Sequence, residues 1–266
     1  MNKISELAVI SKGARIAQGV EIGPYAIIED DVEISSGVKI WPHAHICSGA
    51  RIGEKTEVHM GAVVGHLPQD LSFDPKVKTL AVIGKGTVIR EYATIHRSTK
   101  EGLGTKVGDG CYLMALSHVG HDCHLGNNVI LANGSLLAGH VEVGDNSFIS
   151  GNVVVHQFCR LGDYCIIGGF SGVNKDVPPY MLVRGPSVLR SVNLVSLRRA
   201  KFPRETIHKI MEAFKLLYHS NLNTSQAIDE IKKLGPSKEL DHLIEFIQSS
   251  KRGICKYKYS DSEFFE

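Results

Sequence analysis

An aliphatic residue recurs at every sixth position over most of the first 175 residues of the chain. The series is all isoleucine or valine from Ile10 to Val64, resumes at Ile83, and continues from Val107 to Val173 as valine, leucine or isoleucine. No helix has a period of six, and a strand has a period of two. The repeating unit is therefore a short strand followed by a turn, and three units close a triangular coil of about 18 residues. Such coils stack at the spacing of strands, about 4.8 Å, so the pattern predicts a parallel β-helix.

The residue two positions before each aliphatic is mostly alanine, serine or cysteine, and glycine often follows the aliphatic. Small side chains fit a tight corner, and glycine accepts turn conformations with positive φ. The pattern by itself leaves the handedness of the coil open.

Two segments interrupt the repeat, at residues 66–82 and 98–105. Excursions from a solenoid usually project from one edge and often shape a binding site. The first contains Gln69 and Asp70 in the compact sequence PQD. We expect a β-helix domain over residues 1–186 with loop insertions at these two places.

The period becomes helical beyond Pro186. Apolar residues with helical spacing lie at 207–218, a second helix is predicted from Thr224 to Leu234, and a third contains Leu240 to Ile247. We expect an α-helical C-terminal domain over 187–255 and a loose tail over 256–266. Together these segments predict an all-β solenoid followed by a C-terminal α-helical domain.

The composition excludes several classes of protein. The formal net charge of +2 gives no global basic field, so no nucleic acid is expected as a partner. The apolar runs are much shorter than the ~20 residues of a transmembrane segment, and the N-terminus lacks the layout of a signal peptide. Six scattered cysteines without a CxxC pair indicate thiols in a cytosolic protein.

The length of one coil predicts which residues lie next to several of the histidines. Residues about 18 apart lie on the same face of successive coils, so His121 stacks on Gly139, and Asp122 stacks on His140. His156 and Gln157 form a further polar pair in the following coil. A neutral imidazole can act as a general base, a carboxylate can orient it, and a glycine N–H can stabilise an oxyanion. These groups together suit acyl transfer, with direct attack by a hydroxyl or amine of the substrate.

Two alternatives stay open for this cluster. The spacing HxxHxxH at His118, His121 and His124 could indicate zinc. However, His118 and His124 share one phase of the repeat and His121 lies half a period away, so convergence on one ion is disfavoured. The histidines could also be purely structural.

The chain resembles a known family through several motifs. These are PQDL in the first insertion, TIHR at 94–97, HVGHDC at 118–123, LAGH at 137–140, VHQF at 155–158, and DVPPY at 176–180. Together they are similar to the UDP-N-acetylglucosamine 3-O-acyltransferases of lipid A biosynthesis. The resemblance implies a left-handed β-helix and a cytoplasmic homotrimer with its sites between neighbours. It also implies transfer of an (R)-3-hydroxyacyl chain from acyl carrier protein to the 3-position of UDP-N-acetylglucosamine, without a metal or other cofactor.

The resemblance also suggests roles for single residues. His121 resembles the general base, Asp122 its partner, and Gly139 the oxyanion donor. Other positions correspond to residues that line the sugar, the phosphates or the acyl chain: Gln69, Asp70, His118, His140, His156 and Gln157. Gly169 falls where the family limits the length of the acyl chain, and Asn193 and Arg199 fit its nucleotide-contacting pattern.

Two positions depart from the family pattern. Ser72 stands where lysine is usual, and Val195 stands where an acid is usual. Some family members that lack both charges acylate a 3-amino sugar, so N-acylation is the alternative. A γ-class zinc carbonic anhydrase and a non-catalytic β-helix scaffold are the rival classes.

Overall fold

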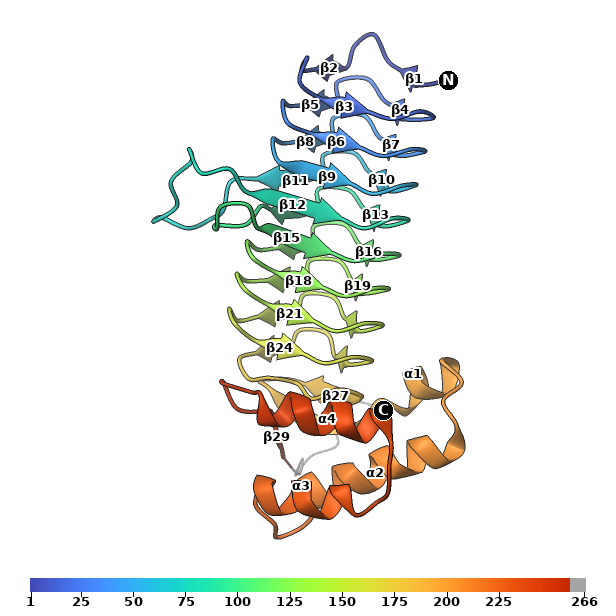
Figure 1. Cartoon of the computed structure of the whole chain (residues 1–266), viewed down its shortest axis with the longest axis vertical. Coiled ribbons are helices and arrows are strands. Elements are labelled where there is room, and N and C mark those ends of the chain that lie inside the picture. Colours follow the sequence, from blue (N-terminus) through green and yellow to red (C-terminus); the bar gives the residue numbers. More distant parts are fainter. Residues whose placement is uncertain (259–266) are drawn as a thin grey trace.

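The computed structural model describes residues 1–258, which form a long triangular prism with helices at one end (Figure 1). Three sheets built mainly of parallel strands make the faces of the prism, and we name them sheets A, B and C in the order in which the chain visits them.

Sheet A contains 12 strands. Its members are β1 (Lys3–Ile4), β4 (Glu21–Ile22), β7 (Lys39–Ile40), β10 (Glu57–Val58), β13 (Val88–Ile89), β16 (Tyr112–Leu113), β19 (Ile130–Leu131), β22 (Phe148–Ile149), β25 (Ile166–Ile167), β27 (Met181–Arg184), β28 (Val188–Val192) and β29 (Lys256–Tyr257).

Sheet B contains nine strands and sheet C eight. Sheet B consists of β2 (Val9–Ile10), β5 (Ile27–Ile28), β8 (His45–Ile46), β11 (Val63–His66), β14 (Thr94–His96), β17 (His118–Val119), β20 (Leu136–Leu137), β23 (Val154–Val155) and β26 (Gly172–Val173). Sheet C consists of β3 (Arg15–Ile16), β6 (Glu33–Ile34), β9 (Ala50–Ile52), β12 (Leu80–Ile83), β15 (Gly104–Val107), β18 (His124–Leu125), β21 (Glu142–Val143) and β24 (Arg160–Leu161).

The six-residue aliphatic series forms the core. Ile28 pairs in register with Ile46 on sheet B, and both side chains are fully buried, as is Val64 in the next coil. The backbone groups of each short strand form hydrogen bonds with the strands of the coils above and below. Each coil therefore depends on its neighbours for stability.

Both insertions leave the prism at the corner between sheets B and C, which we call the B–C corner. The first runs through residues 67–79, between β11 and β12, and the second through residues 97–103, between β14 and β15 (Figure 1). They are shorter than the predicted 66–82 and 98–105 because β12 and β15 lengthen to four residues and pair with each other from Leu80 and Gly104 onwards.

The C-terminal part contains four helices: α1 (Leu194–Arg199), α2 (Arg204–Tyr218), α3 (Thr224–Lys232) and α4 (Lys238–Gln248). The last three lie where apolar periodicity predicts helices. The α3 N-cap is Asn223, one residue before the predicted Thr224, and its side chain accepts a hydrogen bond from the Gln226 N–H.

The sequence did not predict the first elements of this part. β27 and β28 form an antiparallel hairpin across the expected boundary at residue 186, and α1 follows it. Lys256 and Tyr257 belong to strand β29, paired with β28, so the expected tail does not begin at residue 256. The remainder of that tail, 259–266, lies outside the described residues.

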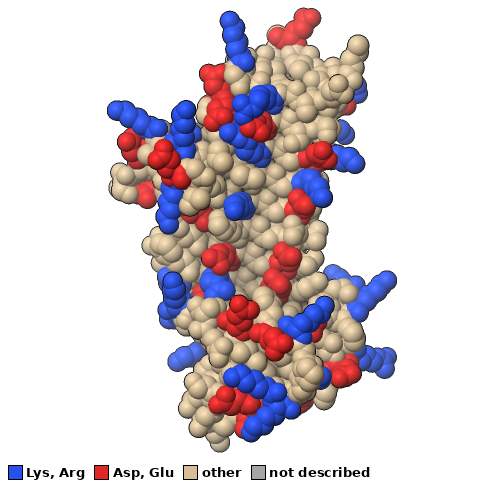
Figure 2. Space-filling model, viewed as in Figure 1, with Lys and Arg blue, Asp and Glu red and all other residues tan. Residues whose placement is uncertain are grey.

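The outer surface carries charges of both signs. Figure 2 shows lysine and arginine interspersed with aspartate and glutamate over the face in view. Within residues 1–258, no helix combines the length and the apolar character that crossing a membrane requires.

Candidate active site

The B–C corner brings together the central residues of the histidine cluster. Three residues spaced by one coil, Asp122, His140 and Phe158, all have left-handed backbone conformations, with φ of 60°, 61° and 63°. The His140 N–H donates a hydrogen bond of 2.9 Å to the His121 carbonyl oxygen, which ties the two corner turns together. The predicted stacking of 121–122 on 139–140 is therefore confirmed by the backbone.

His121 and Asp122 form a close pair. The distance from His121 Nδ1 to Asp122 Oδ2 is 2.8 Å, and the two side chains are 14% and 10% exposed. With the proton on Nδ1, this contact leaves the Nε2 lone pair of His121 free. That is the protonation pattern of a general base whose tautomer is set by a carboxylate.

The Asp122 carboxylate is held by the second insertion. Its Oδ1 accepts a hydrogen bond from the Ser98 hydroxyl, and its Oδ2 accepts one of 2.7 Å from the Thr99 hydroxyl. Burial by itself would raise the pKa of Asp122, but the hydrogen bonds from Ser98, His121 and Thr99 outweigh it and lower the pKa to about 2. The carboxylate is therefore charged at neutral pH and fixed in place beside the imidazole.

Gly139 lies directly against the His121 ring. A Cβ added at Gly139 would stand 2.5 Å from His121 Cε1 and 2.6 Å from Nε2, closer than any side chain can approach. Among the described residues, no acceptor takes a hydrogen bond from the Gly139 N–H. The base thus lies against the backbone of Gly139, whose N–H is left available to an oxyanion.

His140 extends the cluster toward a cavity. Its ring centroid lies 5.2 Å from that of His121, and it stacks on Phe158 with centroids 4.5 Å apart. Asp122, His140 and Phe158 line a cavity of about 700 Å³ that runs along sheet C toward α4. Burial lowers the pKa of His140, which favours its neutral form.

His118 belongs to a row of rings on sheet B. Its Nδ1 lies 2.7 Å from the Thr94 hydroxyl, and its ring meets His96 edge-on with centroids 5.0 Å apart. Burial lowers the pKa of both imidazoles, that of His96 to about 4. These rings border the base without touching Asp122.

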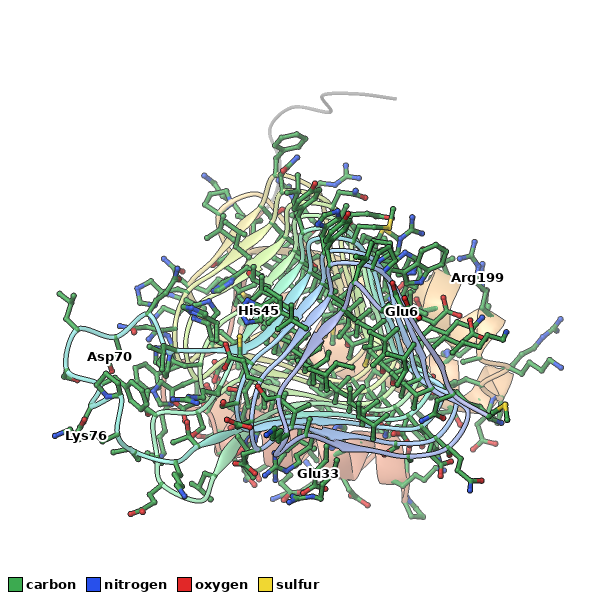
Figure 3. The ribbon with its side chains drawn as sticks, turned by 90° about the horizontal axis from the view of Figure 1, so that it is seen from above. Glu6, Glu33, His45, Asp70, Lys76 and Arg199 are labelled. Atoms are coloured by element: carbon green, nitrogen blue, oxygen red, sulfur yellow. The ribbon has the colours of Figure 1, made fainter. Side chains whose placement is uncertain are left out.

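The first insertion holds Gln69 and Asp70, and Figure 3 shows Asp70 on the loop that projects from the prism. Asp70 Oδ1 accepts hydrogen bonds from the Ser72 N–H (2.9 Å) and the Ser72 hydroxyl (2.7 Å). These two bonds, foremost the one from the hydroxyl, lower the pKa of Asp70. The serine that replaces the usual lysine thus orients the neighbouring acid.

His156 and Gln157 occupy the next turn of the B–C corner and are exposed. His156 Nδ1 lies 3.1 Å from the Gln157 carbonyl oxygen. The two residues and Val154 line a shallow, mostly apolar groove of about 470 Å³. They lie one coil beyond His140, as the six-residue phase predicts.

Three predicted site residues lie elsewhere in the same chain. Gly169 is in the turn between sheets A and B. Asn193 is the N-cap of α1, and Arg199 is the last residue of that helix. Figure 3 places Arg199 on the opposite side of the prism from Asp70. The Asn193 side chain is buried, donates to the Tyr164 carbonyl oxygen (2.7 Å) and caps α1. Within one chain, these residues do not meet His121.

Within residues 1–258, two groups of side chains are spaced closely enough to hold a metal ion. One is His121, Asp122 and His140, and the other is Glu29, His45 and Cys47 in earlier coils. The HxxHxxH triplet does not converge, because His118 is on sheet B and His124 on sheet C. The three imidazoles therefore do not meet at one ion within a chain, as expected.

The residues that hold Asp122 are not among those that the sequence predicts for the site. Ser98 and Thr99 contact it from the second insertion, and its N–H donates to the Thr105 hydroxyl (2.8 Å). Thr94 pairs with His118 in a coil of 24 residues instead of 18. Adding 24 to Ser98 gives Asp122, but the added length of this coil is not readable before the fold is known.

Known proteins match the chain over nearly its whole length. The hexapeptide-repeat transferase family matches residues 104–139 and 140–175, and the second domain of UDP-N-acetylglucosamine O-acyltransferase matches residues 176–255. Acyl-(acyl-carrier-protein)–UDP-N-acetylglucosamine O-acyltransferases from Thermodesulfovibrio yellowstonii and Campylobacter concisus are 44% and 37% identical, over 96% and 98% of this chain and all of theirs.

Solved structures of the same enzyme family resemble this chain over nearly its whole length. LpxA from Bacteroides fragilis, a UDP-N-acetylglucosamine acyltransferase, superposes with a TM-score of 0.91 at 40% identity, covering 94% of this chain and 98% of its own. The shared fold is the left-handed β-helix with C-terminal helices, which confirms the expected fold class. The chain therefore belongs to the acyl-(acyl-carrier-protein)–UDP-N-acetylglucosamine O-acyltransferase family.

Proposed function

We propose that the protein transfers an (R)-3-hydroxyacyl chain from acyl carrier protein to the 3-hydroxyl of UDP-N-acetylglucosamine, as in the first step of lipid A biosynthesis. The names of its full-length relatives support this activity. The observation that carries the chemistry is the His121–Asp122 pair, whose free ring nitrogen lies against the Gly139 backbone.

His121 Nε2 takes the proton of the sugar hydroxyl as its oxygen attacks the thioester carbonyl of the donor. The carbonyl oxygen gains the negative charge and accepts a hydrogen bond from the Gly139 N–H. The tetrahedral intermediate then collapses, the carbon–sulfur bond breaks, and the imidazolium of His121 gives its proton to the departing thiolate. The Asp122 carboxylate stabilises that imidazolium. No residue is acylated, and no cofactor takes part.

The surrounding residues bind the substrates in this proposal. His118, His140, Gln69 and Asp70 border the base and contact the sugar and its phosphates. His156 and Gln157 lie beside the apolar groove, which suits the acyl chain. Gly169, Asn193 and Arg199 lie far from His121 in the same chain, so a neighbouring copy supplies them.

A homotrimer provides such neighbours. The outward face of sheet B exposes apolar side chains, of which Val9 is 61%, Val154 51% and Leu136 40% exposed in a single chain. Leu136 and Val154 are neighbours on the paired strands β20 and β23, and adjacent exposed apolar side chains of this kind suit an interface between proteins. Sedimentation equilibrium of the purified protein then gives a mass about three times the 29.1 kDa of one chain. We place the trimer in the cytoplasm, where six free cysteines are stable.

The deciding experiment assays the purified protein with a hydroxyacyl carrier protein and two acceptors, UDP-N-acetylglucosamine and its 3-amino analogue. Transfer to the hydroxyl acceptor supports the proposal. Exclusive transfer to the amine replaces it with N-acylation by the same base, the outcome that Ser72 and Val195 would favour.

Two further experiments distinguish the proposed acyltransferase from a non-catalytic scaffold and from a zinc carbonic anhydrase. His121→Ala is expected to cause a near-complete loss of turnover with the fold retained, whereas a scaffold would keep its function. Assays after chelation address the γ-class carbonic anhydrase: acyl transfer that persists without metal supports the proposal, and zinc-dependent CO₂ hydration would replace it.

A further inference from the structure

A second cluster of chemically active side chains lies at the B–C corner, several coils before the candidate active site. Glu29 and Cys47 lie in successive turns at this corner, and His45 is on strand β8 just before Cys47. One ligand atom from each of the three residues lies within 4.8 Å of the other two. None of them belongs to the acyl-transfer site described above.

The Glu29 carboxylate is already oriented. Its Oε2 accepts a hydrogen bond of 2.9 Å from the Ser48 N–H, and its Oε1 lies 2.8 Å from His45 Nε2. A metal ligand is commonly held by such an outer hydrogen bond, which fixes its direction. Glu29 Oε1 and His45 Nε2 therefore point at each other, and the proton of their hydrogen bond lies between them.

Cys47 differs from every other cysteine in the chain. The thiols of the other five each lie within hydrogen-bonding reach of a backbone carbonyl oxygen: Cys111, Cys123, Cys159, Cys165 and Cys255. The Cys47 thiol, 4% exposed, has no such acceptor among residues 1–258. It is also the only one of the six that lies in a group with a histidine and a carboxylate at ligand spacing in that part of the chain.

We propose that Glu29, His45 and Cys47 form a binding site for Zn²⁺ or a similar borderline divalent cation. Thiolate, imidazole and carboxylate are the donors that zinc takes in proteins, and three protein ligands leave one position open. Glu29 and Cys47 line a cavity of about 520 Å³ whose other wall includes Lys76 and Lys78 of the first insertion. Water from this cavity completes the tetrahedron.

Metal binding at this place displaces the proton of the Cys47 thiol. The proton of the neutral His45 ring moves from Nε2, which faces Glu29, to Nδ1, so that the ring binds the ion as a neutral imidazole. Burial, with the Glu29 charge beside it, raises the pKa of the Cys47 thiol to about 12 in the metal-free protein. Because each bound ion releases a proton, its affinity rises as the pH rises.

The experiment uses the full-length protein, stripped of metal with a chelator and titrated with Zn²⁺ against a chromophoric competitor. Co²⁺ is the second probe, because a cobalt–thiolate bond gives a charge-transfer absorption in the near ultraviolet. We expect one Zn²⁺ per chain that survives His140→Ala, a substitution in the other metal-competent group. Cys47→Ser and His45→Gln are expected to weaken binding by more than about tenfold.

The matched control is Cys111→Ser, which changes a buried thiol that already donates to the Gly126 carbonyl oxygen. It is expected to leave zinc affinity and the cobalt band unchanged. His45 is half-buried, so His45→Gln tests the site even where Cys47→Ser disturbs the core. Unchanged zinc affinity in both variants, or a cobalt spectrum without the thiolate band, would overturn the proposal.

Discussion

The His121 ring lies so close to Gly139 that no side chain fits between them. The place of a Cβ at Gly139 is 2.5 Å from His121 Cε1. The backbone joins the same two turns through the His140 N–H and the His121 carbonyl oxygen. The backbone of Gly139 therefore forms the surface against which the imidazole lies, and the absence of a side chain at position 139 makes this contact possible.

Gly139→Ala is expected to displace the imidazole and to lower kcat by about 100-fold or more, since misplaced catalytic groups lose much of their effect. The unfolding midpoint should change little, because the residue lies in an outer turn. Steady-state kinetics and thermal unfolding measure the two effects. A double-mutant cycle is the control: in a His121→Ala background, Gly139→Ala should cost nothing further.

Asp122→Asn removes the charge that faces His121 Nδ1 and is expected to lower kcat by about 10²–10³-fold, within the range of general base catalysis. KM for the sugar should stay within a few-fold, because the shape of the side chain is kept. Ser98→Ala and Thr99→Val test its supports, and each should lower kcat by a smaller factor. A wild-type kcat for Asp122→Asn would remove the carboxylate from the mechanism.

His96 makes the stability of the protein sensitive to acid. Burial, with the neighbouring His118 and His66 rings, lowers its pKa from 6.5 to about 4. Between these values the unfolded chain binds a proton that the folded chain does not, so stability falls as the pH falls from about 6.5 to 4. The loss is about 3 kcal/mol for the free energy of unfolding.

Urea unfolding at fixed protein concentration, repeated across this pH range, measures the slope. His96→Phe keeps a ring in the row and removes the titrating group, so the slope should become shallower. Part of it remains, since burial also lowers the pKa of His118. An equally steep slope in the variant would show that other groups cause the acid sensitivity.

Ser72→Ala removes the hydroxyl that donates to Asp70 and leaves the Ser72 N–H as the remaining donor. If Asp70 contacts the sugar nucleotide, we expect KM for the acceptor to rise about three- to tenfold, with a smaller change in kcat. One hydrogen bond to a charged group is worth about 1.5–3 kcal/mol at most, and less in solvent. Ser72→Thr keeps the hydroxyl and is the matched control, expected to behave as wild type.

Periodicity determined the fold because each coil repeats the same local requirement. One inward aliphatic, one small corner residue and a turn are readable every six residues, from Ile10 onward. Fixed stacking then placed His121 over Gly139 and Asp122 over His140 without any coordinates, and the six-residue phase set His121 apart from His118 and His124. The resemblance to the acyltransferase family, carried by motifs such as HVGHDC, supplied the handedness that the period does not contain.

Only the tertiary structure decided how the irregular segments meet the regular ones. The second insertion lengthens its coil to 24 residues, so the contacts of Ser98 and Thr99 with Asp122 follow from a loop conformation that no period encodes. The β27–β28 hairpin and the pairing of β29 depend on long-range contacts of the C-terminal part. The cluster of Glu29, His45 and Cys47 likewise depends on side-chain directions at a corner, which the aliphatic pattern leaves undetermined.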